Sequence, residues 1–135
     1  MIFILHDPIY QQDVLVAIGC PHVPGSNAVE DRIVRAVVRT GYTISDPKEM
    51  AELLVLGVAN GRTVMDPDSG AVVIRLRRLR PNNPKDVGYL VHEAVHAATM
   101  LFGRIGFPLK PETDEPLAYY VQFIVRTVLE KVRKR

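Results

Sequence analysis

The chain has 135 residues, of which 47% are hydrophobic and 24% charged, and these values fit a single soluble domain with one core. Its 17 basic and 15 acidic side chains leave a formal net charge of +2. Proteins that bind nucleic acid by neutralising phosphates usually carry a larger positive excess or a clear basic face. The composition therefore disfavours that class of protein.

Disulfides, cysteine-rich zinc sites and membrane-spanning segments are disfavoured by simple counts along the sequence. Cys20 is the single cysteine, so the chain cannot form an intramolecular disulfide or a cysteine-rich zinc site. No apolar stretch reaches the roughly 20 residues that span a bilayer. The apolar N-terminal run ends at His6, too early for a signal peptide. We therefore expect a cytoplasmic protein with one domain over residues 1–135 and no contact with a membrane.

The first part of the chain predicts two strands followed by two helices. Short runs rich in β-branched residues at positions 2–5 and 14–18 are typical of strands. A helix is then expected to end at Arg39, and a second helix to begin at Pro47 and include Leu56.

A β-hairpin is predicted next. Residues 63–65 and 71–79 flank the sequence Asp-Pro-Asp-Ser-Gly, which is typical of a turn. Four arginines between Arg75 and Arg80 could contact nucleic acid, but no aromatic residues alternate with them to stack on bases. We therefore expect the side chains of Arg75 and Arg77 to form a solvated, charged strand face.

Two long helices are predicted at the C-terminal end. Asn83 is a suitable N-cap for the first, and Gly103 a natural stop. The second is expected to start near Thr113 or Asp114. Its apolar residues follow helical spacing and should be buried: Leu117, Val121, Ile124, Val128 and Val132.

The segment His92-Glu93-Ala94-Val95-His96 lies within the first of these helices. Residues four apart share one helix face, so His92 and His96 can bind one zinc ion. Glu93 can then act as general base toward a water molecule that the zinc acidifies. Two surface histidines without a metal are the alternative interpretation.

A zinc site of this kind needs a third protein ligand. The histidine that metzincins place six residues after the second ligand corresponds here to Phe102. His6 and His22 precede the motif and would have to fold back toward it, and a separate metal pair of Cys20 with His22 has too few ligands. These residues are therefore weak candidates.

Acidic residues after the motif are better candidates for the third ligand. Glu115 stands at the start of the last helix, and an antiparallel helix pair could present it to His92 and His96. Asp114 and Glu112 are its rivals. An acidic residue in a first helical turn also has an ordinary role, because it interacts favourably with the helix dipole.

The histidine motif together with residues 114–120 (DEPLAYY) resembles the gluzincin branch of zinc metallopeptidases. In that branch, a glutamate on a second helix is the third zinc ligand. The two segments are more closely similar to small phage and prophage proteins. Those proteins carry a histidine-acid helix, a short loop and a C-terminal helix with an acid-Glu-x-x-Ala-Tyr sequence. The resemblance covers about residues 71–130.

The resemblance implies a minimal zincin-like fold with His92, His96 and Glu115 as zinc ligands and Glu93 as general base. It also implies that the strand at residues 71–79 is the edge strand on which an extended substrate is laid. An oxyanion stabiliser would be needed as well. The candidates for that role are the tyrosines near the motif and on the last helix: Tyr89, Tyr119 and Tyr120.

We therefore expect an α+β fold in which residues 1–70 form strands and two helices, and residues 71–135 form the strand and helices of the site. The expected function is a phage-type zinc metallopeptidase acting on a peptide or a flexible protein segment. The alternative is an inactive zincin-like phage protein that contacts virion or assembly proteins, and its location could then be the virion. Binding of nucleic acid ranks last.

Overall fold

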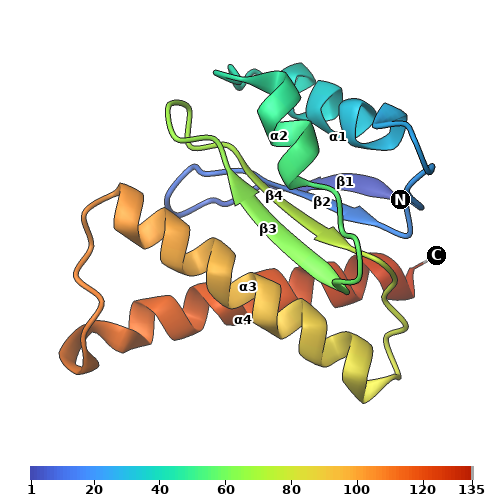
Figure 1. Cartoon of the computed structure of the whole chain (residues 1–135). Helices are drawn as coiled ribbons and strands as arrows, with labels where there is room; N and C mark the ends of the chain where they lie inside the picture. The colour runs from blue at the N-terminus through green and yellow to red at the C-terminus, as the bar shows by residue number, and fades with distance from the viewer. Residues whose placement is uncertain (135) are drawn as a thin grey trace.

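The computed structural model describes residues 1–134, which form a four-stranded sheet and four α-helices (Figure 1). In chain order the elements are β1 (Ile2–Leu5), β2 (Val14–Ile18), α1 (Ala28–Arg39), α2 (Pro47–Leu53), β3 (Gly61–Met65), β4 (Val72–Leu76), α3 (Pro84–Arg104), a short 3-10 turn (Pro111–Thr113) and α4 (Asp114–Arg133).

The sheet is mixed, with the strand order β1-β2-β4-β3. β1 and β2 are antiparallel, and so are β3 and β4, whereas the central pair β2 and β4 is parallel. A parallel pair needs a long crossover connection, and α1 and α2 lie within it. The expected α+β class is confirmed at this level.

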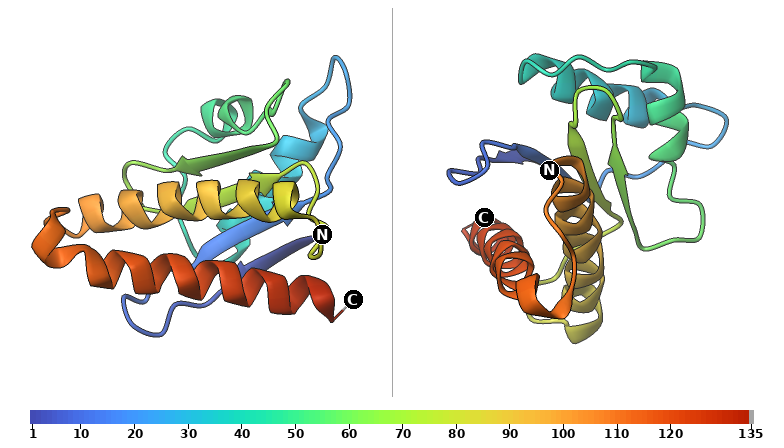
Figure 2. Two further views of the ribbon diagram at one scale, coloured as in Figure 1. Left: turned by 90° about the horizontal axis from the view of Figure 1, so that it is seen from below. Right: turned by 90° about the vertical axis from the view of Figure 1, so that its left-hand side faces the viewer.

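The molecule has three layers, with the sheet in the middle (Figures 1 and 2). α1 and α2 cover one face, and the side chains between them and the sheet include Leu15, Ile33, Val37, Leu54 and Val73. α3 and α4 cover the other face, over a larger core that includes Val16, Ile74, Leu90, Ala98, Phe102 and Ile124. Because helices cover both faces, all five residues of β2 and all five of β4 are buried.

The helices begin and end for local reasons. The Asp46 side chain accepts a hydrogen bond from the backbone N–H of Glu49 at the start of α2, and Asn83 accepts one from Asp86 at the start of α3. Two predicted ends were wrong: α2 stops at Leu53, before Leu56, and α3 continues through Gly103 to Arg104. Glycine lowers helix stability but does not forbid another turn when the helix packs on a core.

The predicted interior stripe of α4 is confirmed at its centre. Ile124 and Val128 are fully buried, and Leu117, Val121 and Val132 pack against the same core while remaining partly accessible. No helix among residues 1–134 is both long and apolar enough to cross a membrane.

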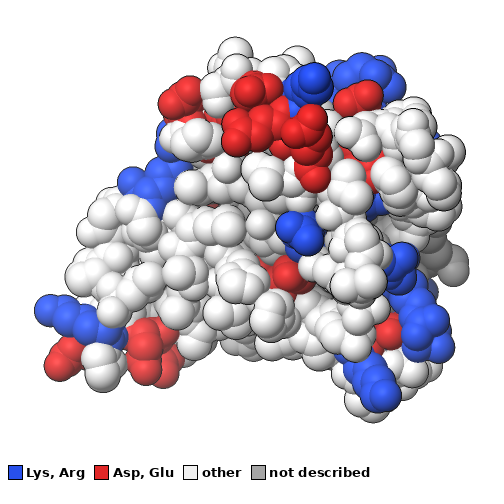
Figure 3. Space-filling view, in the orientation of Figure 1, with Lys and Arg blue, Asp and Glu red and all other residues white. Residues whose placement is uncertain are grey.

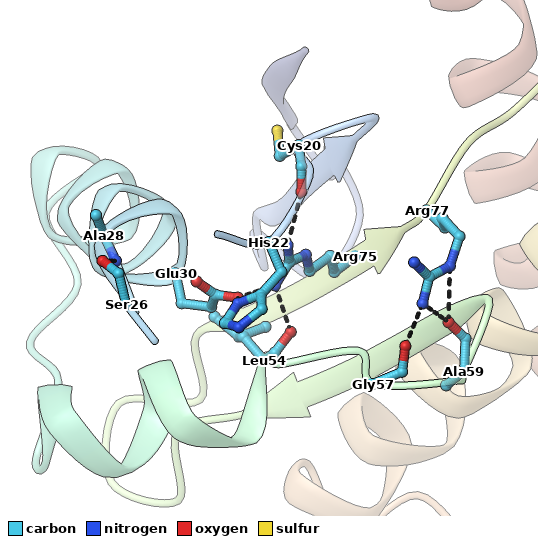
Figure 4. A network of polar contacts seen from close by, with 10 residues as sticks. All are labelled: Cys20, His22, Ser26, Ala28, Glu30, Leu54, Gly57, Ala59, Arg75 and Arg77. Atoms are coloured by element: carbon cyan, nitrogen blue, oxygen red, sulfur yellow. Dashed lines mark hydrogen bonds and ion pairs between the residues drawn. The ribbon is translucent and has the colours of Figure 1, made fainter. Parts of the chain in front are cut away.

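Three expectations for the strand at residues 71–79 were wrong. The strand extends only over Val72–Leu76, and it lies inside the sheet between β2 and β3, so β3 rather than β4 is an edge strand. Arg75 is not solvated: its side chain is 1% exposed and pairs with Glu30 of α1 (Figure 4). Arg75 is therefore not available to bind a phosphate.

Candidate metal centre

α3 carries the two histidines on its exposed side, one helical turn apart. The Nε2 atoms of His92 and His96 are 3.1 Å apart, and both side chains are exposed. Two nitrogens that bind one zinc ion at 2.0–2.1 Å in tetrahedral geometry lie about 3.3 Å apart. The spacing of the imidazole nitrogens therefore suits a shared metal ion.

Glu93 follows His92 but points toward the sheet, because consecutive residues on a helix lie about 100° apart. It is only 5% exposed. The Thr63 hydroxyl of β3 lies 3.2 Å from Glu93 Oε2 and 3.1 Å from the Glu93 carbonyl oxygen, and both are acceptors for its proton. The carboxylate is thus fixed between α3 and the edge strand.

Gly61, at the start of β3, allows this close approach. A Cβ atom at Gly61 would lie 2.8 Å from Glu93 Cγ and 3.0 Å from Leu76 Cδ2. Real Cβ atoms essentially never come as close as the first of these distances. A larger residue at position 61 would therefore displace the Glu93 side chain or the core beneath it.

A hollow of about 260 Å³ opens beside Glu93 and His92, and its remaining walls are Ala59, Asn60, Gly61 and Tyr89. Tyr89 lies one helical turn before His92 and is 39% exposed. Of the three tyrosines proposed as oxyanion stabilisers, Tyr89 is the one that the structure places at this hollow.

Tyr119 and Tyr120 line a different cavity, of about 720 Å³, between α4 and the segment Asp7–Tyr10. Tyr120 is buried there against Tyr10 and Phe102. Burial, together with the nearby Asp7 carboxylate, raises the pKa of Tyr120 above its ordinary value. The Tyr120 phenol therefore stays neutral at physiological pH.

The candidate ligand group of the described residues consists of His92, Glu93 and His96, which offer ligand atoms within 4.8 Å of one another. Asp114 and Glu115 are exposed on the first turn of α4 and do not belong to this group. His96 precedes the end of α3 by eight residues, which correspond to about 12 Å along the helix. The third-ligand role of Glu115 stays a prediction.

The other two histidines have partners of their own. His6 Nδ1 lies 3.2 Å from Asp13 Oδ1 on the surface. His22 Nδ1 lies 2.7 Å from Glu30 Oε1, within the buried network around Arg75 (Figure 4). Cys20 is buried, and its backbone carbonyl accepts a hydrogen bond from Arg75. His6, Cys20 and His22 are thus not part of the metal-ligand group among the described residues.

Sequence reasoning missed Thr63 and Gly61. The predicted strand at residues 63–65 includes Thr63 but not Gly61, where β3 begins, and only the position of β3 over α3 brings the two residues to Glu93. Comparison of the chain with protein-family models, curated proteins and solved structures found no match. What the site can do therefore follows from its own geometry.

Proposed function

We propose that the protein is a zinc-dependent hydrolase of peptide bonds, built as a minimal zincin-like domain with its site on α3. The observation that carries the proposal is the combination of two imidazole nitrogens 3.1 Å apart with a fixed, nearly buried carboxylate on the adjacent residue. The hollow that both Glu93 and His92 line gives a substrate carbonyl a place to enter.

Each residue of the site has a separate role in the proposed reaction. His92 and His96 would hold a zinc ion, which would supply a Lewis acid able to polarise a carbonyl group and to acidify water. The Glu93 carboxylate accepts the proton of the attacking water and returns it to the amine that leaves. The Thr63 hydroxyl bonds to Glu93 Oε2 and limits the rotation of the carboxylate. Tyr89 is positioned at the hollow to donate a hydrogen bond to the developing oxyanion.

The free edge of β3 suits an extended peptide. Every second residue of β3 forms backbone hydrogen bonds with β4. Asn60 and Asp66, just outside the two ends of β3, form backbone hydrogen bonds with the same partner segment and fix this alternation. The backbone groups of Gly61, Thr63 and Met65 therefore point away from β4. A flexible segment can pair with them as an added strand, in register with Glu93.

The remaining parts of the proposal come from the sequence. Glu115 is proposed as the third zinc ligand, with Asp114 as its alternate, by resemblance to the gluzincin branch. The same resemblance favours a phage or prophage origin, and we propose a cytoplasmic location from the composition of the chain.

The alternative proposal is an inactive zincin-like protein that binds virion or assembly proteins and is located in the virion. The exposed side chains of α3 between Val87 and Gly103 carry no Asp, Glu, Lys or Arg, and this favours the alternative, because such surfaces are typical of protein contacts.

The proposal is tested by measuring first the zinc content of the protein and then its rate of peptide hydrolysis. Wild type, purified without chelator, is expected to hold zinc, and His92→Ala is expected to lose it. His6→Ala is the matched control, because His6 is exposed and lies outside the ligand group. Glu93→Gln should keep the metal and lose about 10²- to 10⁴-fold in cleavage of an unstructured casein substrate. Wild type that binds no zinc after zinc is added back would contradict the proposal.

A further inference from the structure

We propose that two copies of this chain share one metal ion, each contributing His92 and His96 from the exposed face of α3. The inference rests on the metal-binding part of the proposed function and is independent of hydrolysis. It concerns the state of the same site when no substrate is bound.

The first observation is the surface of α3 around the histidines. Between Val87 and Gly103 this helix carries one charged residue, Glu93, and that residue is buried. Large apolar side chains on the same stretch are exposed: Tyr89 by 39%, Val91 by 38% and Val95 by 43%. Figure 3 shows a broad, mostly white area over the middle of α3, in which one acidic side chain is partly visible with a basic side chain beside it, and more charged residues lie toward the ends of the helix.

Exposure of a helix face with apolar side chains to water is unfavourable in free energy, and burial of that face against another surface is favourable. In a two-fold symmetric dimer the same surface patch of both copies meets at the interface, so the patch must be complementary to itself. The α3 face meets this condition, because two uncharged surfaces bring no like charges together at the centre of the contact.

The second observation is that one chain supplies too few ligands for a closed site. Within the described residues, the ligand group adds only Glu93 to the two histidines, and the Glu93 carboxylate is held beneath β3 by Thr63. Structural zinc sites take four ligands in tetrahedral geometry. Two α3 helices related by a two-fold axis through the ion would supply four imidazole nitrogens.

The two observations support each other because they concern the same face of the same helix. The exposed residues Tyr89 and Val95 stand three residues before and three residues after His92, and residues three apart are neighbours on a helix surface, so covering this surface brings the histidines of both copies together. The partner helix would also cover the hollow that His92 lines. In the dimer the second copy covers the site, so a substrate peptide and the second copy would compete for the same surface of α3.

The experiment is sedimentation velocity of the full chain, freed of metal with a chelator, before and after addition of zinc, with a calorimetric zinc titration alongside. The expected result is a monomer that becomes a dimer on binding one zinc per two chains. His92→Ala should abolish the dimer, and His6→Ala should not change it. Val95→Lys should weaken dimerisation at least about tenfold, because it places like charges opposite each other. Val38→Lys, at an exposed position on α1, on the opposite side of the sheet from α3, is its control.

Other outcomes would overturn the inference in distinguishable ways. One zinc per monomeric chain would refute metal sharing and leave the proposed hydrolase standing, and loss of that zinc in Glu115→Ala would then identify the third ligand. A dimer that persists without zinc or in His92→Ala would show that the metal does not join the copies. Absence of zinc binding would refute both this inference and the proposed function. Circular dichroism of each variant checks that it is folded.

Discussion

Arg75 of β4 and Glu30 of α1, 45 residues apart in the sequence, form an ion pair in which neither side chain is more than 1% exposed. Arg75 Nη1 lies 2.8 Å from Glu30 Oε1 and also donates to the carbonyl of Leu54, while Nη2 donates to the carbonyl of Cys20 (Figure 4). One guanidinium therefore fixes α1, the end of α2 and the segment after β2 to the central strand.

Replacement of Arg75 by methionine should be strongly destabilising. It leaves the Glu30 carboxylate buried without its cation, and loss of one partner of a buried pair costs about 3–5 kcal/mol. The free energy of unfolding in urea measures the loss. Arg77→Met is the matched control, since Arg77 is on the same segment but has exposed hydrogen bonds to the carbonyls of Gly57 and Ala59. A loss below about 1 kcal/mol in Arg75→Met would show that water reaches Glu30.

The stability of the protein should fall in acid through Asp86. Hydrogen bonds from Arg80 lower the pKa of Asp86 from 3.8 to about 2, against the opposing effect of burial. A carboxylate whose pKa is lower in the folded state stabilises the fold above its ordinary pKa, and this contribution disappears as protons bind. The Asp86 contribution is thus present above pH 3.8 and is lost as the pH falls toward 2.

Unfolding measured in urea at several pH values between 5 and 2 tests this expectation. Arg80→Gln should lower stability at pH 5 and reduce its dependence on pH. Some pH dependence should remain, because hydrogen bonds from Arg75 and His22 outweigh burial and lower the pKa of Glu30 as well. An Arg80→Gln protein with an unchanged acid profile would contradict the role assigned to the Arg80–Asp86 pair.

Local features of this fold were predictable because they depend on a few neighbouring residues. The caps of α2 and α3 follow from a side chain that accepts a backbone N–H three residues later, as with Asp46 and Asn83. The hairpin turn between β3 and β4 follows in the same way from Asp66, whose carboxylate accepts the backbone N–H of Ser69. The grouping of His92 and His96 follows from helical spacing alone.

Features that depend on the order of strands could not be predicted in this way. The alternation in β4 indicates a polar face at Arg75, and only the covering of that face by α1 shows that Arg75 is buried. The pairing of β4 with β2 makes it an inner strand, although its own residues suit an edge strand. Thr63 approaches Glu93 for the same reason, since its place at the sheet edge is set by strands distant in sequence.

The cap of α3 should matter for the stability of the fold and not for metal binding. Asn83 accepts the backbone N–H of Asp86 across 3.1 Å, and replacing such a cap by alanine costs about 1 kcal/mol. Asn83→Ala should therefore lower the midpoint of thermal unfolding while leaving zinc affinity unchanged, because His92 lies more than two turns further along α3. Asn82→Ala, one residue earlier and exposed, is the control. Equal thermal midpoints for the two variants would contradict the capping role.

Gly61→Ala should show whether the position of the Glu93 carboxylate affects hydrolysis independently of metal binding. The new Cβ would lie 2.8 Å from Glu93 Cγ and 3.0 Å from Leu76 Cδ2, and overpacking of this kind costs about 1–3 kcal/mol. The atoms nearest to the new Cβ belong to Glu93 and Leu76, so the exposed His92 and His96 should keep the ability to bind zinc that we propose for them. Hydrolysis should fall, because the carboxylate moves from its hydrogen bond with Thr63.

Gly88→Ala on α3 is the matched control for this substitution. A Cβ there meets nothing within 4 Å, and alanine should stabilise the helix by about 0.5–1 kcal/mol. Urea unfolding should therefore show a loss of stability for Gly61→Ala and a gain for Gly88→Ala. Zinc titration should show equal affinities for the two variants. If Gly61→Ala instead lost its zinc along with its stability, the carboxylate of Glu93 would be a metal ligand rather than a proton acceptor beside the metal.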